Sequence, residues 1–237
     1  MKIDFQSLVV FQDNDFLVIN KPAHISSTED RTGDIDLQTL AKRHDPHLFA
    51  CHRLDKETSG CLLFAKNEEA YRHASIQFEK RTLEKIYHAF SNGIHEFKNE
   101  VSTLPILPLK KGMVIIDQAQ GKDSKTSFNT LEIYKGHTLI ECRPKTGRMH
   151  QIRIHLSKKD APIINDELYG GKPLFLSEIK KKYKLGRDQD EQPLVKRVVL
   201  HAYALEFFDM QNKKVEAIAH YPKDLRVLHK QLTANKY

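Results

Sequence analysis

Length, charge and composition place this chain among folded soluble proteins. Its 237 residues suffice for one large domain or two small ones, and 40% hydrophobic with 29% charged residues is ordinary for a globular chain. The formal net charge of +7 favours an anionic partner but does not by itself distinguish nucleic acid from small counterions.

Three features argue against a secreted or membrane protein. Cys51, Cys61 and Cys142 lack CxxC spacing, and their odd, sparse number argues against a disulfide framework and for a reducing compartment. The N-terminus carries Asp4 where a signal peptide needs an apolar run. No apolar stretch approaches the ~18 residues of a membrane span. We therefore expect a soluble, cytoplasmic protein.

Apolar runs and alternating patterns bounded by turn residues predict strands. In chain order these lie at 9–11, 16–19, 61–65, 86–90 and 138–142, and short strands form a meander between 100 and 135. The second strand ends at the Asn-Lys-Pro sequence of residues 20–22, because proline cannot continue a hydrogen-bonded ladder.

Helical spacing predicts a short helix with Leu37, Leu40 and Ala41 after the polar loop 28–34, and three longer helices. The longer helices cover 67–80, 148–158 and 224–234. Asn67 is placed to cap the first of these and Thr146 to cap the second. Because the strands do not alternate with helices, we predict an α+β fold with a mixed, largely antiparallel central sheet, in a single domain spanning 1–237.

Residues 52–60 (HRLDKETSG) directly precede the apolar run 61–65, which reads as a buried strand. A loop next to such a strand is fixed to a rigid scaffold. The carboxylate of Asp55 lies among His52, Arg53 and Lys56, whose positive charge would keep it ionised. This setting suits a nucleophile or base acting on a polyanion, although the charge pattern alone favours a surface ion pair in a loop.

Residues 145–156 (KTGRMHQIRIHL) form a second motif. Met149, Ile152 and Leu156 share one helical face, while Ile152, Ile154 and Leu156 also alternate as in a strand; we favour the helix. On a helix, Arg153 lies at the edge of the buried face, where a guanidinium needs a carboxylate. A solvated basic face is the alternative.

Both motifs, in this order, resemble those of the RluA-type pseudouridine synthases, which isomerise uridine in RNA. Weaker matches include Asn-Lys-Pro at 20–22, Lys-x-Tyr at 85–87, and Arg-x-x-Leu-His-Ala at 197–202. The matches span about residues 9 to 225. The small RNA-binding domain that many relatives carry ahead of the catalytic domain has no counterpart in this sequence.

The sequence departs from the family pattern at a few positions. His24 stands where relatives usually have glycine, and Ser27-Thr28 where they often have His-Pro. Ser124 replaces a usual alanine. Asn165 replaces the first glycine of a Gly-Asp-x-x-Tyr-Gly turn.

The resemblance implies the pseudouridine synthase fold, with a catalytic cleft that crosses the sheet. It also implies three catalytic residues. Asp55 acts at the ribose as nucleophile or general base, Arg153 is its salt-bridge partner, and Tyr87 lies against the flipped base. Without the resemblance, Tyr87 reads as a core aromatic. The expected RNA-binding residues are Arg53, His52, Arg148, His150 and Lys21.

We accordingly expect an isomerase that needs no cofactor and no metal, is a monomer, and acts on structured ribosomal or transfer RNA. The basic segment 180–187 is either a solvated lysine face or a phosphate contact. Two alternatives remain: a non-catalytic RNA-binding module or RNA chaperone, and a nucleosidase-like hydrolase. A hydrolase of that kind usually needs two working carboxylates, and only Asp55 has the matching context.

Overall fold

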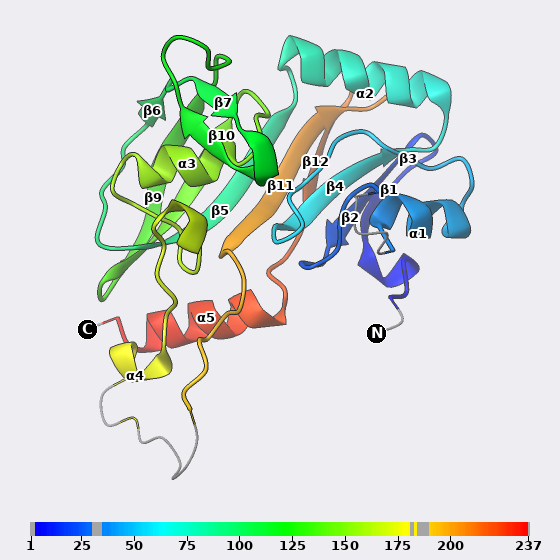
Figure 1. Cartoon of the computed structure of the whole chain (residues 1–237). Helices are drawn as coiled ribbons and strands as arrows, with labels where there is room; N and C mark the ends of the chain where they lie inside the picture. Colours follow the sequence, from blue (N-terminus) through cyan, green and yellow to red (C-terminus); the bar gives the residue numbers. More distant parts are fainter. Residues whose placement is uncertain (1–2, 30–34, 181–182, 184–189, 237) are drawn as a thin grey trace. The chain divides into compact units, whose positions relative to one another are not determined.

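The computed structural model describes residues 3–29, 35–180, 183 and 190–236, and the chain divides into two compact units (Figure 1). The first unit comprises 1–86 and 201–220, and the second comprises 87–200 and 221–237. The chain therefore passes from one unit to the other at three points, and neither unit is a continuous stretch of sequence. Most of the basic segment 180–187 lies outside the described residues.

Six strands with most of their residues in the first unit build its sheet, as far as the described residues show. In order across the sheet they are β1 (Val9–Gln12), β2 (Phe16–Lys21), β4 (Ser59–Ala65) and β11 (Leu200–Phe208), with β3 (Phe49–Ala50) on β4 and β12 (Lys214–Ile218) on β11. β4 and β11 pair in parallel, with His201 opposite Ser59, and the other pairs are antiparallel. The sheet of this unit is mixed, as predicted.

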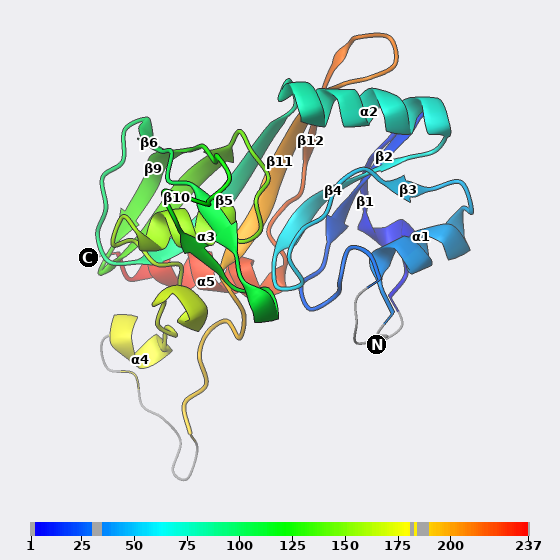
Figure 2. The ribbon, with the colours of Figure 1, turned by 45° about the horizontal axis from the view of Figure 1, so that its top comes forward.

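The alternation of side chains along β2 and β4 explains where the helices of the first unit pack. Phe16, Val18 and Leu63 pack with Ala70 and Ala74 of α2 (Glu68–Lys80). The intervening residues face the other side. They pack with α1 (Leu37–His44), and they are Leu17, Ile19, Leu62 and Phe64. A short 3-10 helix, η1 (Gln6–Leu8), precedes all of these elements in the chain. Figure 2 shows β2, β3 and β4 between α2 and α1.

Local capping sets the start of the two α-helices described in the first unit, α1 and α2. The side chain of Asn67 accepts from Ala70 N at 2.8 Å, which confirms the predicted cap of α2. Glu68 and Glu69 in the first turn complement the helix dipole. Asp36 caps α1 by accepting from Thr39 N at 2.9 Å.

The second unit contains a sheet with the order β5 (Glu84–Asn92), β10 (His137–Pro144), β9 (Thr126–Tyr134) and β6 (Glu100–Ser102), all antiparallel. The first three residues of β5 belong to the first unit. A separate hairpin pairs β7 (Ile106–Pro108) with β8 (Val114–Ile116). The helices of this unit are η2 (Lys110–Gly112), α3 (Gln151–Ser157), η3 (Glu167–Tyr169), α4 (Leu176–Ile179) and α5 (Lys223–Ala234).

Burial on two sides explains the ambiguous apolar pattern of α3. Ile152 and Leu156 join the core of the sheet, whereas Ile154 packs with Ile106 and Val114 of the β7–β8 hairpin. A helix covered on both sides carries more apolar residues than one face requires, and a strand-like alternation can result. The helix prediction is therefore confirmed.

The predicted cap of α3 is wrong. The N-cap position is occupied by His150, at φ +52°, and no side chain caps the helix there. Thr146 instead donates from Oγ1 to Gln151 Oε1 at 2.7 Å and accepts from Lys125 N at 3.0 Å, which joins the start of the motif to α3 and to the residue before β9.

The α+β class is confirmed by both units. Among the described residues, no helix combines the length and the apolar content needed to cross a bilayer.

We predict that Gly60→Ala is strongly destabilising. Gly60 has φ +115°, and a Cβ there would meet Ala202 O at 2.1 Å. A clash with backbone adds to the left-handed strain, so we expect a loss of roughly 3 kcal/mol or more in the free energy of unfolding. Urea denaturation measures it.

The matched control is Gly136→Ala. Gly136 also has positive φ, +73°, but a Cβ there meets nothing within 4 Å. Only the backbone strain then applies, about 1 kcal/mol. Equal losses in the two variants would show that close packing of β4 on β11 is not the constraint.

Candidate active site

The loop that carries Asp55 is held on every side by the first unit. It follows residues 49–52, where Cys51 N donates to Leu63 O of β4 at 2.8 Å. The loop then turns, with Thr58 N donating to Asp55 O at 3.0 Å, and enters β4, which is buried along its whole length. Leu54 is buried, Asp55 is partly buried and Arg53 is exposed. The Asp55 carboxylate is thus presented from a fixed backbone beside an accessible arginine.

Lys21 supports this loop from within the protein. Its side chain has no exposed surface, and Nζ donates to the carbonyls of Pro22, Ile25 and Lys56 at 3.0, 2.7 and 3.2 Å. A side chain without exposed surface cannot reach an RNA phosphate, so the predicted phosphate contact of Lys21 is wrong. Lys21 instead connects the turn after β2 with Lys56, the residue that follows Asp55.

His52 is also a structural residue of the loop. Its Nε2 accepts from Leu63 N at 3.1 Å, and its ring lies 5.1 Å from that of Phe78. Burial, reinforced by the charge of Lys85, lowers the pKa of His52 to about 3. The imidazole is therefore neutral near pH 7, and it does not supply the positive charge beside Asp55 that the sequence led us to expect.

A buried ion pair forms the centre of the candidate site in the second unit. Arg153, 7% exposed, donates from Nε and Nη2 to both carboxylate oxygens of Asp166, 1% exposed in its side chain, each at 2.7 Å. This is the bidentate geometry in which a guanidinium binds a carboxylate most strongly. The Arg153 guanidinium also lies 5.1 Å from the centre of the Tyr169 ring, a cation–π contact.

Tyr169 connects this ion pair to two further elements. Its hydroxyl accepts from Val114 N of β8 at 3.2 Å and bonds with His150 Nδ1 at 2.9 Å. His150 therefore contacts Tyr169, the residue whose ring covers the Arg153 guanidinium. Arg148 is partly buried, and its Nε donates to Asp123 O at 3.0 Å. The RNA contacts expected of His150 and Arg148 stay predictions.

The sequence reasoning missed Asp166 as the partner of Arg153. The residue stands in the turn at 165–171 that resembles the family's Gly-Asp-x-x-Tyr-Gly element, and that resemblance predicts no chemistry for it. The available signal was that a carboxylate in a turn rich in glycine follows a buried arginine by thirteen positions. Proximity across a loop of that length is not determined by helical or strand periodicity.

The predicted residues fall into two groups. The first unit brings together Arg53, Asp55, His52 and Lys21, and the second contains Arg148, His150, Arg153 and Tyr87. Tyr87 is partly buried on β5, opposite Cys142 of β10. The ion pair between Asp55 and Arg153 stays a prediction, as does the catalytic cleft.

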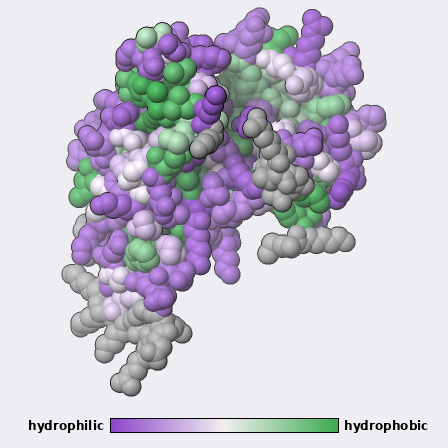
Figure 3. Space-filling model, in the orientation of Figure 1, coloured by the Kyte–Doolittle hydropathy of each residue, from purple (hydrophilic) through white to green (hydrophobic). Residues whose placement is uncertain are grey.

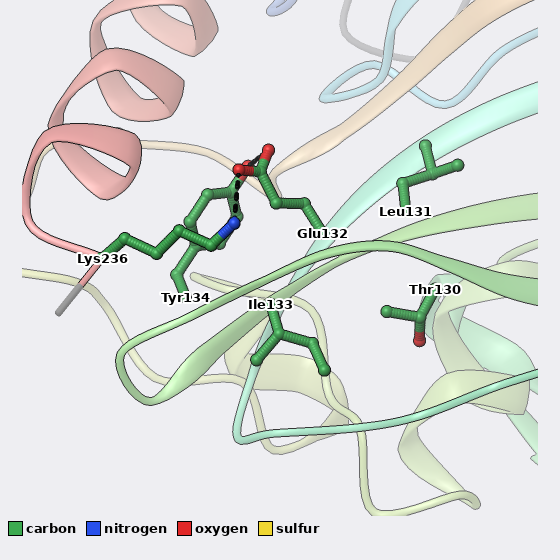
Figure 4. Close-up of a pocket in the computed structure, with 6 residues that line it drawn as sticks. All are labelled: Thr130, Leu131, Glu132, Ile133, Tyr134 and Lys236. Carbon is green, nitrogen blue, oxygen red and sulfur yellow. Dashed lines mark hydrogen bonds and ion pairs between the residues drawn. The ribbon is translucent and has the colours of Figure 1, made fainter.

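Two other features give no sign of a second chemistry. A hollow of about 480 Å³ lies along β9, where Lys236 and Tyr134 both donate to Glu132, and it contains none of the predicted residues (Figure 4). Burial raises the pKa of Cys51 and of Cys61 to about 12, so neither thiol is a nucleophile near neutral pH.

Hydrophilic side chains cover most of the face seen in Figure 3.

Comparison with known proteins identifies the family. The family model for RNA pseudouridylate synthase matches residues 15–158. The chain belongs to the RNA pseudouridylate synthase family. It is accordingly an isomerase of RNA uridines, and the resemblance to the RluA-type enzymes is confirmed.

The similarity extends along nearly the whole chain. An uncharacterized RNA pseudouridine synthase of Zymomonas mobilis is 33% identical over 225 residues, which cover 91% of this chain and 94% of the relative. Ribosomal large subunit pseudouridine synthase C of Buchnera aphidicola is 33% identical over 90% of this chain and 66% of its own length. The chain spans roughly half to two thirds of the relatives with ribosomal names.

A solved structure supports the fold. Human RNA pseudouridylate synthase domain containing 1 is 27% identical and has a TM-score of 0.67, over 90% of this chain and 83% of the human one. The predicted pseudouridine synthase fold is confirmed.

We predict that Asp166→Asn destabilises the second unit. The substitution leaves the buried Arg153 charge against a neutral amide, and removing one partner of a buried pair costs about 3–5 kcal/mol. The control is Glu100→Gln, because Glu100 pairs with Lys159 at 2.6 Å while its side chain is 49% exposed. That variant should lose less than about 1 kcal/mol. Similar losses by urea denaturation would contradict a special role for the buried pair.

We predict a pH dependence that originates at His52. Because its pKa is lowered to about 3 in the fold, the unfolded chain binds a proton that the folded chain does not, and stability falls as pH decreases below about 6.5. Comparison with His52→Gln, which keeps a hydrogen-bond acceptor, isolates this contribution. From pH 7 to 5 the wild type should lose roughly 1–2 kcal/mol more than the variant. Parallel pH profiles in thermal denaturation would refute it.

Proposed function

We propose that this enzyme converts uridine to pseudouridine in ribosomal RNA, with Asp55 as its catalytic carboxylate. The observation that carries the proposal is that the matched family region, 15–158, contains Asp55, Tyr87 and Arg153. These are the three residues for which the sequence resemblance implies catalytic roles. The ribosomal target rests on the names of relatives such as synthase C of Buchnera aphidicola. Transfer RNA is the other target expected from the sequence.

The reaction requires little beyond one carboxylate. The bond between ribose C1′ and base N1 breaks, the base rotates, and a new bond joins C1′ to base C5. The C5 proton is released to solvent and N1 gains a proton, so that no redox partner is needed. Asp55 either attacks C1′ as a nucleophile or removes a ribose proton to give a glycal-like intermediate. Its fixed loop supports either role, because a held carboxylate needs little reorganisation.

Arg153 would orient Asp55 and keep it charged once water is excluded. The bidentate bond to Asp166 uses Nε and Nη2, and a guanidinium has five N–H donors, so one arginine can serve two carboxylates. Tyr169 beneath the guanidinium restricts it further. In this proposal Asp166 and Tyr169 are the residues that preset Arg153 for the catalytic pair.

RNA binding would involve extrusion of the target base. Moving the base out of its stack costs a few kcal/mol of free energy. Stacking of the extruded base on an aromatic ring such as Tyr87 contributes about 1–3 kcal/mol of stabilisation. Arg53 is exposed next to Asp55, and in this proposal it contacts the strand from which the base leaves. Since the family match includes residues of both units, we infer that 1–237 acts as one catalytic domain.

The proposal predicts that Asp55→Asn abolishes turnover. The assay is release of tritium to water from ribosomal RNA that carries tritium at uridine C5, prepared from cells lacking the protein. We expect a loss of at least about 10³-fold, with the fold and most RNA affinity retained. Asp45→Asn is the control, because within the described part of the chain its side chain accepts only from His47 N and an amide oxygen can replace it.

Turnover by Asp55→Asn at the wild-type rate would end the catalytic assignment. Pseudouridine mapping of ribosomal and transfer RNA, with and without the protein, tests the target separately. A site that disappears only from transfer RNA would overturn the ribosomal assignment.

A further inference from the structure

The residue before Asp55 is held by a buried serine from a distant part of the first unit. Ser27 is 3% exposed, and its Oγ donates to Leu54 O at 3.0 Å while it accepts from Leu54 N at 2.9 Å. One hydroxyl thus satisfies both backbone polar groups of Leu54. Such a two-point contact defines the position and the orientation of the peptide groups on either side of Leu54.

The residue after Asp55 is held from the same segment. Lys56 O accepts from Lys21 Nζ at 3.2 Å and from His24 N at 2.8 Å. Side-chain and backbone donors of residues 21–27 therefore bind the chain immediately before and immediately after the catalytic carboxylate. Torsion of the Asp55 backbone is restricted from both sides.

Segment 21–27 is itself anchored to a helix. Leu37 N donates to Ser26 O at 2.9 Å and Gln38 N to Ser27 O at 3.1 Å. These are the first N–H groups of α1, which lack partners within the helix. Ser27 thus connects the start of α1 through its carbonyl and the Asp55 loop through its hydroxyl.

We propose that Ser27 is a positioning residue for catalysis: its hydroxyl sets the Asp55 backbone through Leu54. This inference rests on the proposed role of Asp55.

The test is Ser27→Ala, measured in three ways. Catalysis is followed by tritium release from the same C5-labelled ribosomal RNA, per folded molecule. We expect kcat to fall ~10-fold or more with KM changed less than about twofold, because misplacement of a reacting group affects the chemical step. Hydrogen exchange of the Leu54 amide should accelerate ~10-fold or more, since its acceptor is removed. Thermal denaturation reports the folded fraction.

Ser102→Ala is the matched control. Ser102 is also a buried serine, 4% exposed, and among the described residues its Oγ has no hydrogen-bond partner. Its removal should leave kcat and the exchange of Leu54 unchanged.

The outcomes separate this inference from the proposed function. If Asp55→Asn abolishes turnover while Ser27→Ala keeps the wild-type kcat, the positioning role is overturned and the catalytic role of Asp55 stands. Unchanged exchange at Leu54 overturns the hydrogen bond itself, whatever the activity. A loss confined to thermal stability also overturns the proposal, because a merely structural serine does not change kcat per folded molecule.

Discussion

A guanidinium removed from water needs a carboxylate, and much of the second unit is arranged to meet that need. Arg153 lies on a helix covered on two sides, and Asp166 meets it with both oxygens from a turn outside the helix. Tyr169 then covers the cation and binds β8 through its hydroxyl. The Arg153 side chain thereby connects α3, the turn that carries Asp166, and the β7–β8 hairpin. In the proposed reaction, an arginine preset in this way would leave little reorganisation for the moment at which Asp55 reacts.

The elements were predictable wherever a local signal exists. Strand runs at 16–19 and 61–65, the capped helix at 67–80 and the C-terminal helix all follow from periodicity and capping residues. The two motifs also identified the loop of Asp55 and the helix of Arg153. What the sequence could not supply were contacts between segments distant in the chain. Asp166 as the partner of Arg153 is one example, and the role of Lys21 within the fold is another.

Electrostatic expectations failed for a related reason. His52 reads as a cation in the sequence because its neighbours are polar and charged. Its ring is instead enclosed against Phe78 and accepts a backbone N–H, so that the neutral form is favoured. Burial of a side chain within a polar stretch is a tertiary property, and a charge pattern alone does not reveal it. Two departures from the family pattern, by contrast, have a local explanation. His24 and Asn165 replace glycines, and both have positive φ, +65° and +63°.

The interleaved course of the chain has a consequence for biosynthesis. The first unit needs residues 201–220, which supply the parallel neighbour of β4 and the strand beyond it. A ribosome must therefore synthesise most of the polypeptide before this sheet can be completed. Until then β4, a strand made mostly of apolar residues, lacks its hydrogen-bonded neighbour β11. Pairing over some 140 positions of sequence also makes the closing step slow, because loop closure precedes any stabilising contact.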